Sequence, residues 1–322
     1  MLDYDDSSRH SFASMDRPRL VSSLQAYLFS ITYRSQSLVL LLIIAADGYN
    51  DSVPTPIWQD LPHSERHCFR QFAVEVARDA GNLLLRRARE GFRVEYKAAV
   101  NLVTDADRAA EDHIVSAIRQ SFPSHRLLAE EGGAVAPAES PYQWIIDPLD
   151  GTTNFAHGFP FYSVSIALEY AGHCVLGAVL DPIRNELFTG ETGAGALLNG
   201  ERINVSRVTT VDRSLLVTGF AYDIRDNPNN NLDHFARLSL HAQGVRRTGS
   251  AALDLCYVAT GRFDGFWEVT LKPWDMAAGL VILEEAGGLV TSFSKNIFSI
   301  YGQELVATNG LIHDELLLLL NQ

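Results

Sequence analysis

Cysteine is scarce in this sequence. Only three of the 322 residues are cysteine, and Cys68, Cys174 and Cys256 lie far apart. An odd number of widely spaced cysteines argues against the disulfide framework that stabilises small secreted domains. We therefore expect reduced thiols and a cytoplasmic location.

Long hydrophobic runs are also missing. The apolar run Leu38 to Ala46 (LVLLLIIAA) is far shorter than the about 20 residues that a membrane helix needs. It also begins too deep in the chain, without a basic start, for a secretory signal. We interpret residues 1–63 as an N-terminal extension that is disordered or loosely packed, with a membrane or targeting role as the alternative. Residues 64–322 are then the folded domain.

Basic residues are outnumbered by acidic ones. Lys and Arg together number 26 against 39 Asp and Glu, which gives a formal net charge of −13. Proteins that bind nucleic acid directly need a basic surface, so this class is not expected. The apolar fraction of 47% is that of an ordinary globular protein and excludes a wholly disordered chain. An acidic balance suits a protein that uses carboxylates to bind metal ions.

The periodicity of the domain predicts helices mixed with a β-meander. An apolar stripe from Phe69 to Leu84 predicts a helix that Ser64 caps and Gly91 ends. Turn signals at 171–172, 181–182 and 199–200 divide a meander between residues 162 and 205. The remaining predicted helices are 105–122, 232–243, 251–260 and 274–286, and the remaining strands are 126–129, 143–146, 215–220, 263–269 and 289–293. This order indicates an α+β fold of layered sheets and helices rather than one parallel sheet.

The densest chemistry lies in WIIDPLDGTTNF, Trp144 to Phe155. Asp147 and Asp150 are three residues apart, and a tight turn between them would direct both carboxylates into one space. The N–H groups of Gly151 and Thr152 would face the same space and suit a phosphate, while the Leu149 carbonyl could add an oxygen ligand. For this segment alone, an Asp-rich turn that caps a helix remains the alternative.

Further acids stand where a predicted strand or helix begins or ends. Glu130 and Glu131 follow a short strand, Asp275 opens an apolar helix, and Asp105 and Asp107 stand at another helix start. Each alone is typical of a helix N-cap. Two bare carboxylates about 4 Å apart repel by about 4 kcal/mol at an effective dielectric constant near 20, so a cluster needs cations. Oxygen ligands favour Mg²⁺, which indicates phosphoryl chemistry with water as the nucleophile.

Three longer motifs resemble the inositol monophosphatase family, most closely its bacterial branch. They are the segment from Trp144 to Phe155, RTGSAALDLCYVATGRFDGFWE from Arg247 to Glu268, and PWDMAAGLVILEEAGG from Pro273 to Gly288. The similarity extends from about Glu65 to the C-terminus. It implies a layered α/β sandwich of alternating helix pairs and β-sheets, of the sugar/inositol phosphatase type, and a homodimer.

The resemblance also implies a role for individual residues. One Mg²⁺ would be bound by Glu130, Asp147 and the Leu149 carbonyl, a second by Asp147, Asp150 and Asp275, and a third, weaker ion by Glu130 through water. Asp107 and Thr152 match the pair that orients the attacking water, and Glu130 belongs to the same catalytic group. Lys97 matches a basic residue of less certain role. Substrate contacts are implied for Asp150, Gly151, Thr152, Gly249, Ser250, Ala251, Glu268 and Asp275.

The function that follows is Mg²⁺-dependent, lithium-sensitive hydrolysis of a phosphate monoester, with inositol 1-phosphate as the family's usual substrate. Fructose 1,6-bisphosphate, histidinol phosphate and 3′-phosphoadenosine phosphates are alternatives, since Arg246, Arg247 and Lys272 could bind a second phosphate or simply be solvated. A regulator of the transcription machinery with residual phosphatase activity is a further alternative. His157 is interpreted as a supporting residue, and Trp144 and Trp274 as core residues that fix the neighbouring acids.

Overall fold

The computed structural model describes residues 57–96, 102–135, 139–296 and 298–322. Lys97 and nearly all of the predicted extension therefore lie outside the described residues. The last part of the extension is described, and Trp58 in the short helix η1 (Trp58–Asp60) is buried against Phe69 and Tyr170. The packed chain thus begins at least five residues before the predicted boundary.

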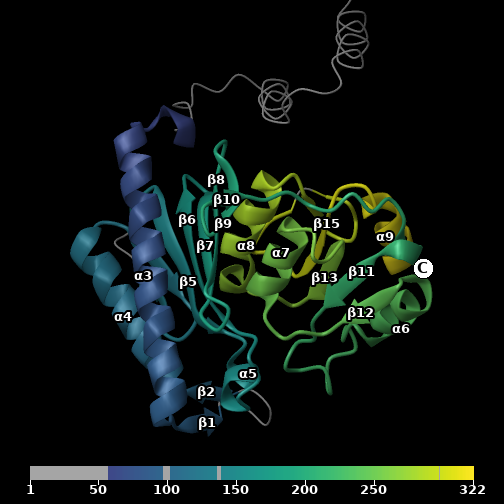
Figure 1. Ribbon diagram of the computed structural model, residues 1–322, viewed down its shortest axis with the longest axis horizontal. Helices are drawn as coiled ribbons and strands as arrows, with labels where there is room; N and C mark the ends of the chain where they lie inside the picture. The colour runs from purple at the N-terminus through teal and green to yellow at the C-terminus, as the bar shows by residue number, and fades with distance from the viewer. Residues whose placement is uncertain (1–56, 97–101, 136–138, 297) are drawn as a thin grey trace, which may run out of the picture. The chain divides into compact units, whose positions relative to one another are not determined.

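The described residues form alternating layers of helices and sheets (Figure 1). The first layer pairs α3 (His63–Glu90) with α4 (Asp105–Ser121). They cover an eight-stranded sheet with the order β10-β9-β8-β7-β6-β5-β3-β4. Its strands are β3 (Arg126–Ala129), β4 (Gly133–Val135), β5 (Tyr142–Asp150), β6 (Ser163–Tyr170), β7 (His173–Asp181), β8 (Glu186–Glu191), β9 (Gly195–Leu198) and β10 (Glu201–Arg202).

The second half of the chain supplies the other layers. Helices α7 (Ala251–Ala259) and α8 (Pro273–Glu285) pack between the large sheet and a five-stranded sheet. That sheet has the order β12-β11-β13-β15-β14, with β11 (Leu215–Thr218), β12 (Gly244–Arg246), β13 (Gly265–Val269), β14 (Leu289–Thr291) and β15 (Glu304–Thr308). Its outer face is covered by α6 (Leu232–His241) and α9 (His313–Leu320). The predicted α+β layered sandwich is confirmed.

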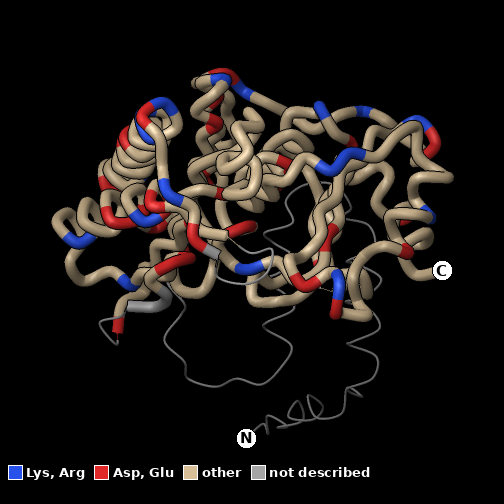
Figure 2. Tube along the Cα trace, turned by 90° about the horizontal axis from the view of Figure 1, so that it is seen from below, with Lys and Arg blue, Asp and Glu red and all other residues tan. Residues whose placement is uncertain are grey.

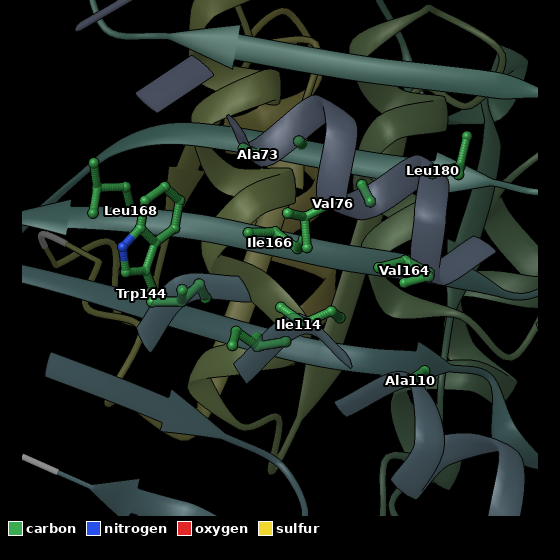
Figure 3. Close-up of a cluster of buried hydrophobic side chains, with 14 of the residues drawn as sticks. Ala73, Val76, Ala110, Ile114, Trp144, Val164, Ile166, Leu168 and Leu180 are labelled. Carbon is green, nitrogen blue, oxygen red and sulfur yellow. The ribbon is translucent and has the colours of Figure 1, made fainter. Parts of the chain in front are cut away.

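Both faces of the large sheet are buried, because helices lie on each side. Trp144 and Ile146 of β5 point into the core beneath α3 and α4, whereas Ile145 between them belongs to the core around α7 and α8. This alternation is the period of two that a strand imposes. Figure 3 shows the first core, in which Trp144, Ile166 and Ile114 come from β5, β6 and α4. Trp144 is fully buried, as predicted.

Several predicted boundaries are confirmed and one cap is wrong. The meander turns at 171–172 and 199–200 have positive φ, as the Ala-Gly and Asn-Gly pairs predicted. Gly91 ends α3 with φ +97°. Ser64, however, does not cap α3: the helix begins at His63, and its N-cap residue, Pro62, uses no side chain. The Pro62 carbonyl accepts the Glu65 N–H instead, so the first turn closes without a side-chain cap.

Two smaller features complete the description. β1 (Val94–Tyr96) and β2 (Leu102–Thr104) form an antiparallel pair at the start of α4. In Figure 2, Lys and Arg positions are interspersed with Asp and Glu positions along the described chain. Within the described ranges, none of the helices is both long and apolar enough to cross a membrane.

Candidate active site

A cleft of about 420 Å³ collects nearly all of the predicted site residues. It lies where β3 and β5 end and where α7 and α8 begin, together with the short helix α5 (Thr152–Ala156). The predicted residues that line it are Glu130, Asp147, Leu149, Asp150, Gly151, Thr152, Gly249, Ser250, Ala251, Glu268 and Asp275. Residues that are up to 145 positions apart in sequence therefore face one space.

The two acids of the central motif stand on a β-bulge, which corrects the predicted tight turn. β5 continues through Asp150, but its pairing with β6 shifts register between Asp147 and Asp150, which oppose Ser165 and Ser163. In a regular strand, residues three apart point to opposite faces. The extra residue of the bulge removes this alternation, so both carboxylates reach the cleft. Leu149 N–H donates to Asp147 Oδ1 at 3.0 Å and fixes that side chain.

Asp150 joins the two halves of the fold at the start of α7. Its Oδ2 accepts hydrogen bonds from the Ser250 hydroxyl at 2.6 Å and from the Ala252 N–H at 2.8 Å. A carboxylate at a helix N-terminus satisfies N–H groups that have no partner within the helix. Asp150 therefore ties β5 to the segment that carries Gly249, Ser250 and Ala251.

The remaining two acids are fixed by their own helix or strand end. Asp275 is the third residue of α8, and its Oδ2 accepts the Lys272 N–H at 2.7 Å, as in a capping box. Glu130 follows β3, which pairs in parallel with β5 up to the partners Ala129 and Ile146. The strand ends of β3 and β5 are thus adjacent, which brings Glu130 beside Asp147.

Burial and mutual repulsion raise the pKa values of these acids. Desolvation raises the pKa of Asp147 well above its ordinary value, and the charges of Glu130, Asp150 and Asp275 raise it further. Desolvation raises the pKa of Asp150 to about 6 although several hydrogen bonds oppose the shift. Burial and the Asp150 charge raise the pKa of Asp275 in the same direction. Such a cluster is unfavourable until cations neutralise it.

The donor set fits a hard divalent cation. The candidate ligands are carboxylate and carbonyl oxygens, which suit Mg²⁺ rather than Zn²⁺. Among the described residues, no three His, Cys, Asp or Glu side chains already stand in an arrangement that could hold a metal ion. The chemistry of the donors therefore supports the predicted metal site, and its ligand geometry stays a prediction.

Asp107 and Thr152 are in direct contact, as the resemblance implies. The Thr152 hydroxyl lies 3.0 Å from Asp107 Oδ1 and 3.1 Å from the Leu149 carbonyl. Asp107 is fully buried, and its Oδ2 accepts the N–H of Thr104 at 2.8 Å, which completes a capping box at the start of α4. The Thr152 hydroxyl can donate its one proton to Asp107 Oδ1 or to the Leu149 carbonyl, which leaves its own oxygen free to accept a hydrogen bond.

Gly151 occupies a backbone conformation that few other residues tolerate. Its φ is +98°, and a Cβ there would lie 3.1 Å from the carbonyl oxygens of both Gly249 and Phe161. Positive φ with so little space requires glycine. The sharp reversal lets α5 start directly after β5, with Gly151 and Thr152 lining the cleft.

Replacing Gly151 by Ala is expected to lower kcat/KM for a phosphate ester by about 10- to 100-fold, because the backbone must shift away from the position that suits phosphate. The measurement is steady-state hydrolysis together with inhibition by inorganic phosphate, which should weaken in parallel. Gly172 is a matched control, since its φ is +86° but a Cβ there meets nothing within 4 Å. A Gly172→Ala variant that loses as much activity would show that backbone strain alone explains the effect.

Of the other residues considered from the sequence, three line the cleft and two do not. Arg247, Lys272 and Trp274 line the cleft, so Trp274 faces the site as well as the core. Arg246 is exposed at the end of β12, where it pairs with Val217 of β11, and it is not part of the cleft lining. His157 is exposed at the end of α5 and is also not part of the lining.

Sequence reasoning missed four residues that shape the site. Asp254 lines the cleft and is buried next to the Thr248 hydroxyl. Glu111, one turn after Asp107 on α4, accepts the Glu131 N–H at 2.8 Å and holds the chain beyond Glu130. Asn154 donates to the carbonyls of Phe161 and Thr248. Tyr222 also lines the cleft. Their roles depend on contacts that only the folded chain makes, so residue spacing gave no signal.

Comparison with known proteins places this architecture in one family. Residues 65–322 match the profile of the "Inositol monophosphatase family". An inositol-1-monophosphatase of Synechocystis is 50% identical over 68% of this chain and 76% of its own length. The Nus factor SuhB of Pseudomonas aeruginosa is 48% identical over 69% of this chain and 84% of its own length.

A solved structure of an inositol monophosphatase has a similar fold. The inositol monophosphatase from Anabaena (Nostoc) superimposes with a TM-score of 0.73 at 44% identity, covering 80% of this chain and 97% of that one. Similarity of this extent, over the residues that carry the cleft, establishes both the fold and the reaction class. The chain belongs to the inositol monophosphatase family and is a phosphoric monoester hydrolase.

Proposed function

We propose that this protein is a Mg²⁺-dependent inositol-1-monophosphatase that converts myo-inositol phosphate and water to myo-inositol and phosphate. The observation that carries the proposal is an acid cluster beside the Gly151–Thr152 turn, in which Asp147 and Asp150 are buried and Asp275 and Glu130 are partly exposed. The substrate follows from the relative in Synechocystis and the solved structure from Anabaena, both of which bear this activity in their names.

The metal would be held by the oxygen ligands predicted above. One Mg²⁺ would bind Glu130, Asp147 and the Leu149 carbonyl, a second would bind Asp147, Asp150 and Asp275, and a third would bind more weakly at Glu130. When bound, Mg²⁺ supplies a water of lowered pKa and neutralises charge on the phosphoryl group.

The protein's own groups position the reactants. The Thr152 hydroxyl donates its hydrogen bond to Asp107 or to the Leu149 carbonyl, so its oxygen can accept a hydrogen bond from the attacking water and align it. The N–H groups of Gly151 and Thr152 hold phosphoryl oxygens. Glu268, which lines the cleft, accepts hydrogen bonds from hydroxyl groups of the substrate. Gly249, Ser250 and Ala251 complete the substrate-binding wall.

The rate acceleration that this reaction needs shows why charge neutralisation must contribute more than acid–base catalysis. Hydrolysis of a phosphate monoester needs acceleration of up to about 10²¹-fold. General acid–base catalysis by one side chain contributes about 10²–10⁴-fold. Electrostatic stabilisation and positioning therefore have to supply most of the rate.

A panel of phosphate esters tests the substrate. With Mg²⁺, we expect inositol 1-phosphate to give a higher kcat/KM than fructose 1,6-bisphosphate, histidinol phosphate or 3′-phosphoadenosine 5′-phosphate. Arg247 and Lys272 stand at the cleft, so a bisphosphate is the strongest competitor. A clear preference for any of the other three esters would replace the proposed substrate.

Lithium provides a second test. We expect millimolar Li⁺ to inhibit hydrolysis, because a small monovalent cation can occupy a metal position without neutralising the same charge. The assay compares LiCl with NaCl and KCl at equal ionic strength and at several Mg²⁺ concentrations. Equal rates in all three salts would contradict the proposed lithium sensitivity.

A role in regulating transcription is the second candidate, favoured by the Nus factor SuhB of Pseudomonas aeruginosa among the relatives. A catalytically inactive Asp147→Asn variant that still supports growth where the gene is required would favour it. The homodimer and the cytoplasmic location remain predictions from the sequence.

A further inference from the structure

One wall of the cleft is built by the segment that connects β11 to α6. We call residues 219–231 the wall segment. Its first residues, Gly219, Phe220, Ala221, Tyr222 and Asp223, all line the cleft. The sequence predicted residues 219 and 220 as the end of a strand, whereas β11 ends at Thr218. None of the roles proposed above falls on the wall segment.

Asn231, the last residue of the wall segment, forms hydrogen bonds that connect the end of the segment to its beginning. Its Nδ2 donates to the Thr218 hydroxyl and to the Gly219 carbonyl, each at 2.8 Å. Its Oδ1 accepts the Trp267 indole N–H at 2.7 Å. The side chain is 3% exposed, and its backbone has φ +67°. Asn is one of the few residues that tolerate this left-handed conformation. The backbone conformation and the three hydrogen bonds therefore both favour Asn at position 231.

The same hydrogen bonds connect the wall segment to Glu268. Trp267 directly precedes Glu268 on β13, and its carbonyl accepts the Thr218 hydroxyl at 2.6 Å. Gly219 packs against the Glu268 carboxylate so closely that a Cβ at position 219 would lie 2.1 Å from Glu268 Oε2. Glu268 and the start of the wall segment therefore form one continuous surface.

The wall segment also reaches the phosphate side of the cleft. Tyr222 lines the same cleft as Gly151 and Thr152 at the start of α5. Phe220 packs against Phe235 of α6 with ring centroids 5.6 Å apart, which holds the base of the segment. The wall segment therefore shares the cleft with Glu268 and with the start of α5.

We propose that Asn231 is a positioning residue that sets affinity for the hydroxyl-bearing part of the substrate. It does so by holding the wall segment and Glu268 in one fixed arrangement. The inference rests on the proposed phosphatase function and deepens it, because it assigns recognition of the polyol to a wall whose geometry depends on a residue outside the cleft lining.

The test is an Asn231→Asp variant assayed on two esters. Aspartate keeps the size, the tolerance of positive φ and the acceptor for Trp267, but it removes both N–H donations. We expect KM for inositol 1-phosphate to rise about 10-fold while kcat changes by less than about twofold, the pattern of lost substrate binding. KM for p-nitrophenyl phosphate, whose leaving group offers no hydroxyl to Glu268, should stay unchanged, as should inhibition by inorganic phosphate.

Asn199 provides a matched control. It also has a positive φ, of +50°, and its side chain accepts the Leu187 N–H and donates to the Asn185 carbonyl in a turn of the meander. Asn199→Asp loses a comparable hydrogen bond and should leave both KM values unchanged. If Asn231→Asp does not fold, Thr218→Val removes the hydroxyl that links Asn231 to Trp267 and should raise KM for the inositol ester in the same direction.

The outcomes are distinguishable. An equal rise in KM for both esters, or an unchanged KM for inositol 1-phosphate in the folded variant, overturns the inference and leaves the proposed function standing. A wild-type protein that hydrolyses neither ester overturns the proposed function and this inference with it.

Discussion

Replacing Asp147 by Asn is expected to reduce Mg²⁺-dependent phosphate release by more than about 100-fold, because loss of a metal-binding carboxylate exceeds the 10- to 100-fold cost of losing a supporting partner. Asp147 is the residue proposed to contact both metal ions, and it is 2% exposed in the centre of the acid cluster. An amide retains a carbonyl oxygen for the Leu149 N–H. The local geometry should therefore survive while the charge is lost. Asp275→Asn should act in the same direction.

The melting temperature of the Asp147→Asn variant distinguishes a loss of metal binding from misfolding. Burial and the neighbouring Glu130, Asp150 and Asp275 raise the pKa of Asp147, so its ionised form is disfavoured in the folded state. Without metal, the neutral amide should leave the melting temperature unchanged or higher. Asp112→Asn, on the exposed face of α4, is the control and should keep full activity. An Asp147→Asn protein that retains more than a tenth of wild-type activity would contradict the metal assignment.

Removing the Thr152 hydroxyl is expected to lower kcat by about 100-fold at saturating Mg²⁺, the cost of misplacing a reacting group by about 1 Å. The Thr152→Ala variant loses the group that orients the attacking water, whereas Thr152→Ser keeps the hydroxyl and should retain most of the activity. The Mg²⁺ concentration that gives half-maximal rate should stay the same in both, unlike in Asp147→Asn. Steady-state rates across a Mg²⁺ titration measure both quantities.

Asp107 should be coupled to Thr152. Asp107→Asn weakens the acceptor of the Thr152 hydroxyl, so adding it to Thr152→Ala should cost little more than Thr152→Ala alone. Because Asp107 also closes the capping box with Thr104, the unfolding temperature of the Asp107→Asn variant must be measured together with its activity. Fully multiplicative losses in the double variant would show that the two residues act independently.

Much of the fold could be predicted because its pattern is local. The stripe from Phe69 to Leu84 follows the helical period, and the Asn-Gly turn at 199–200 favours a hairpin. Short elements could not be found this way. β12 has three residues, and its place beside β11 depends on a parallel pairing across α6. The apolar run of α9 is equally compatible with a strand until its packing on the small sheet is known.

The acids of the site could be predicted because they stand where predicted strands and helices begin or end, which is where functional sites form. The sequence did not reveal that their carboxylates point to one side. The shift that directs Asp147 and Asp150 to one side is a bulge, which depends on the register with β6. Asn231 and Glu111 gave no signal, since each acts through backbone groups or side chains that only the folded chain brings near.

The most direct test of the account is anomalous diffraction from crystals grown with Mn²⁺ in place of Mg²⁺. The account predicts at least two peaks in the cleft within about 2.5 Å of carboxylate oxygens, with Asp147 shared between them and Asp150 and Asp275 on one of them. Peaks confined to other places, or a structure in which Asp275 stays beyond coordinating reach of the ion that Asp147 binds, would contradict it.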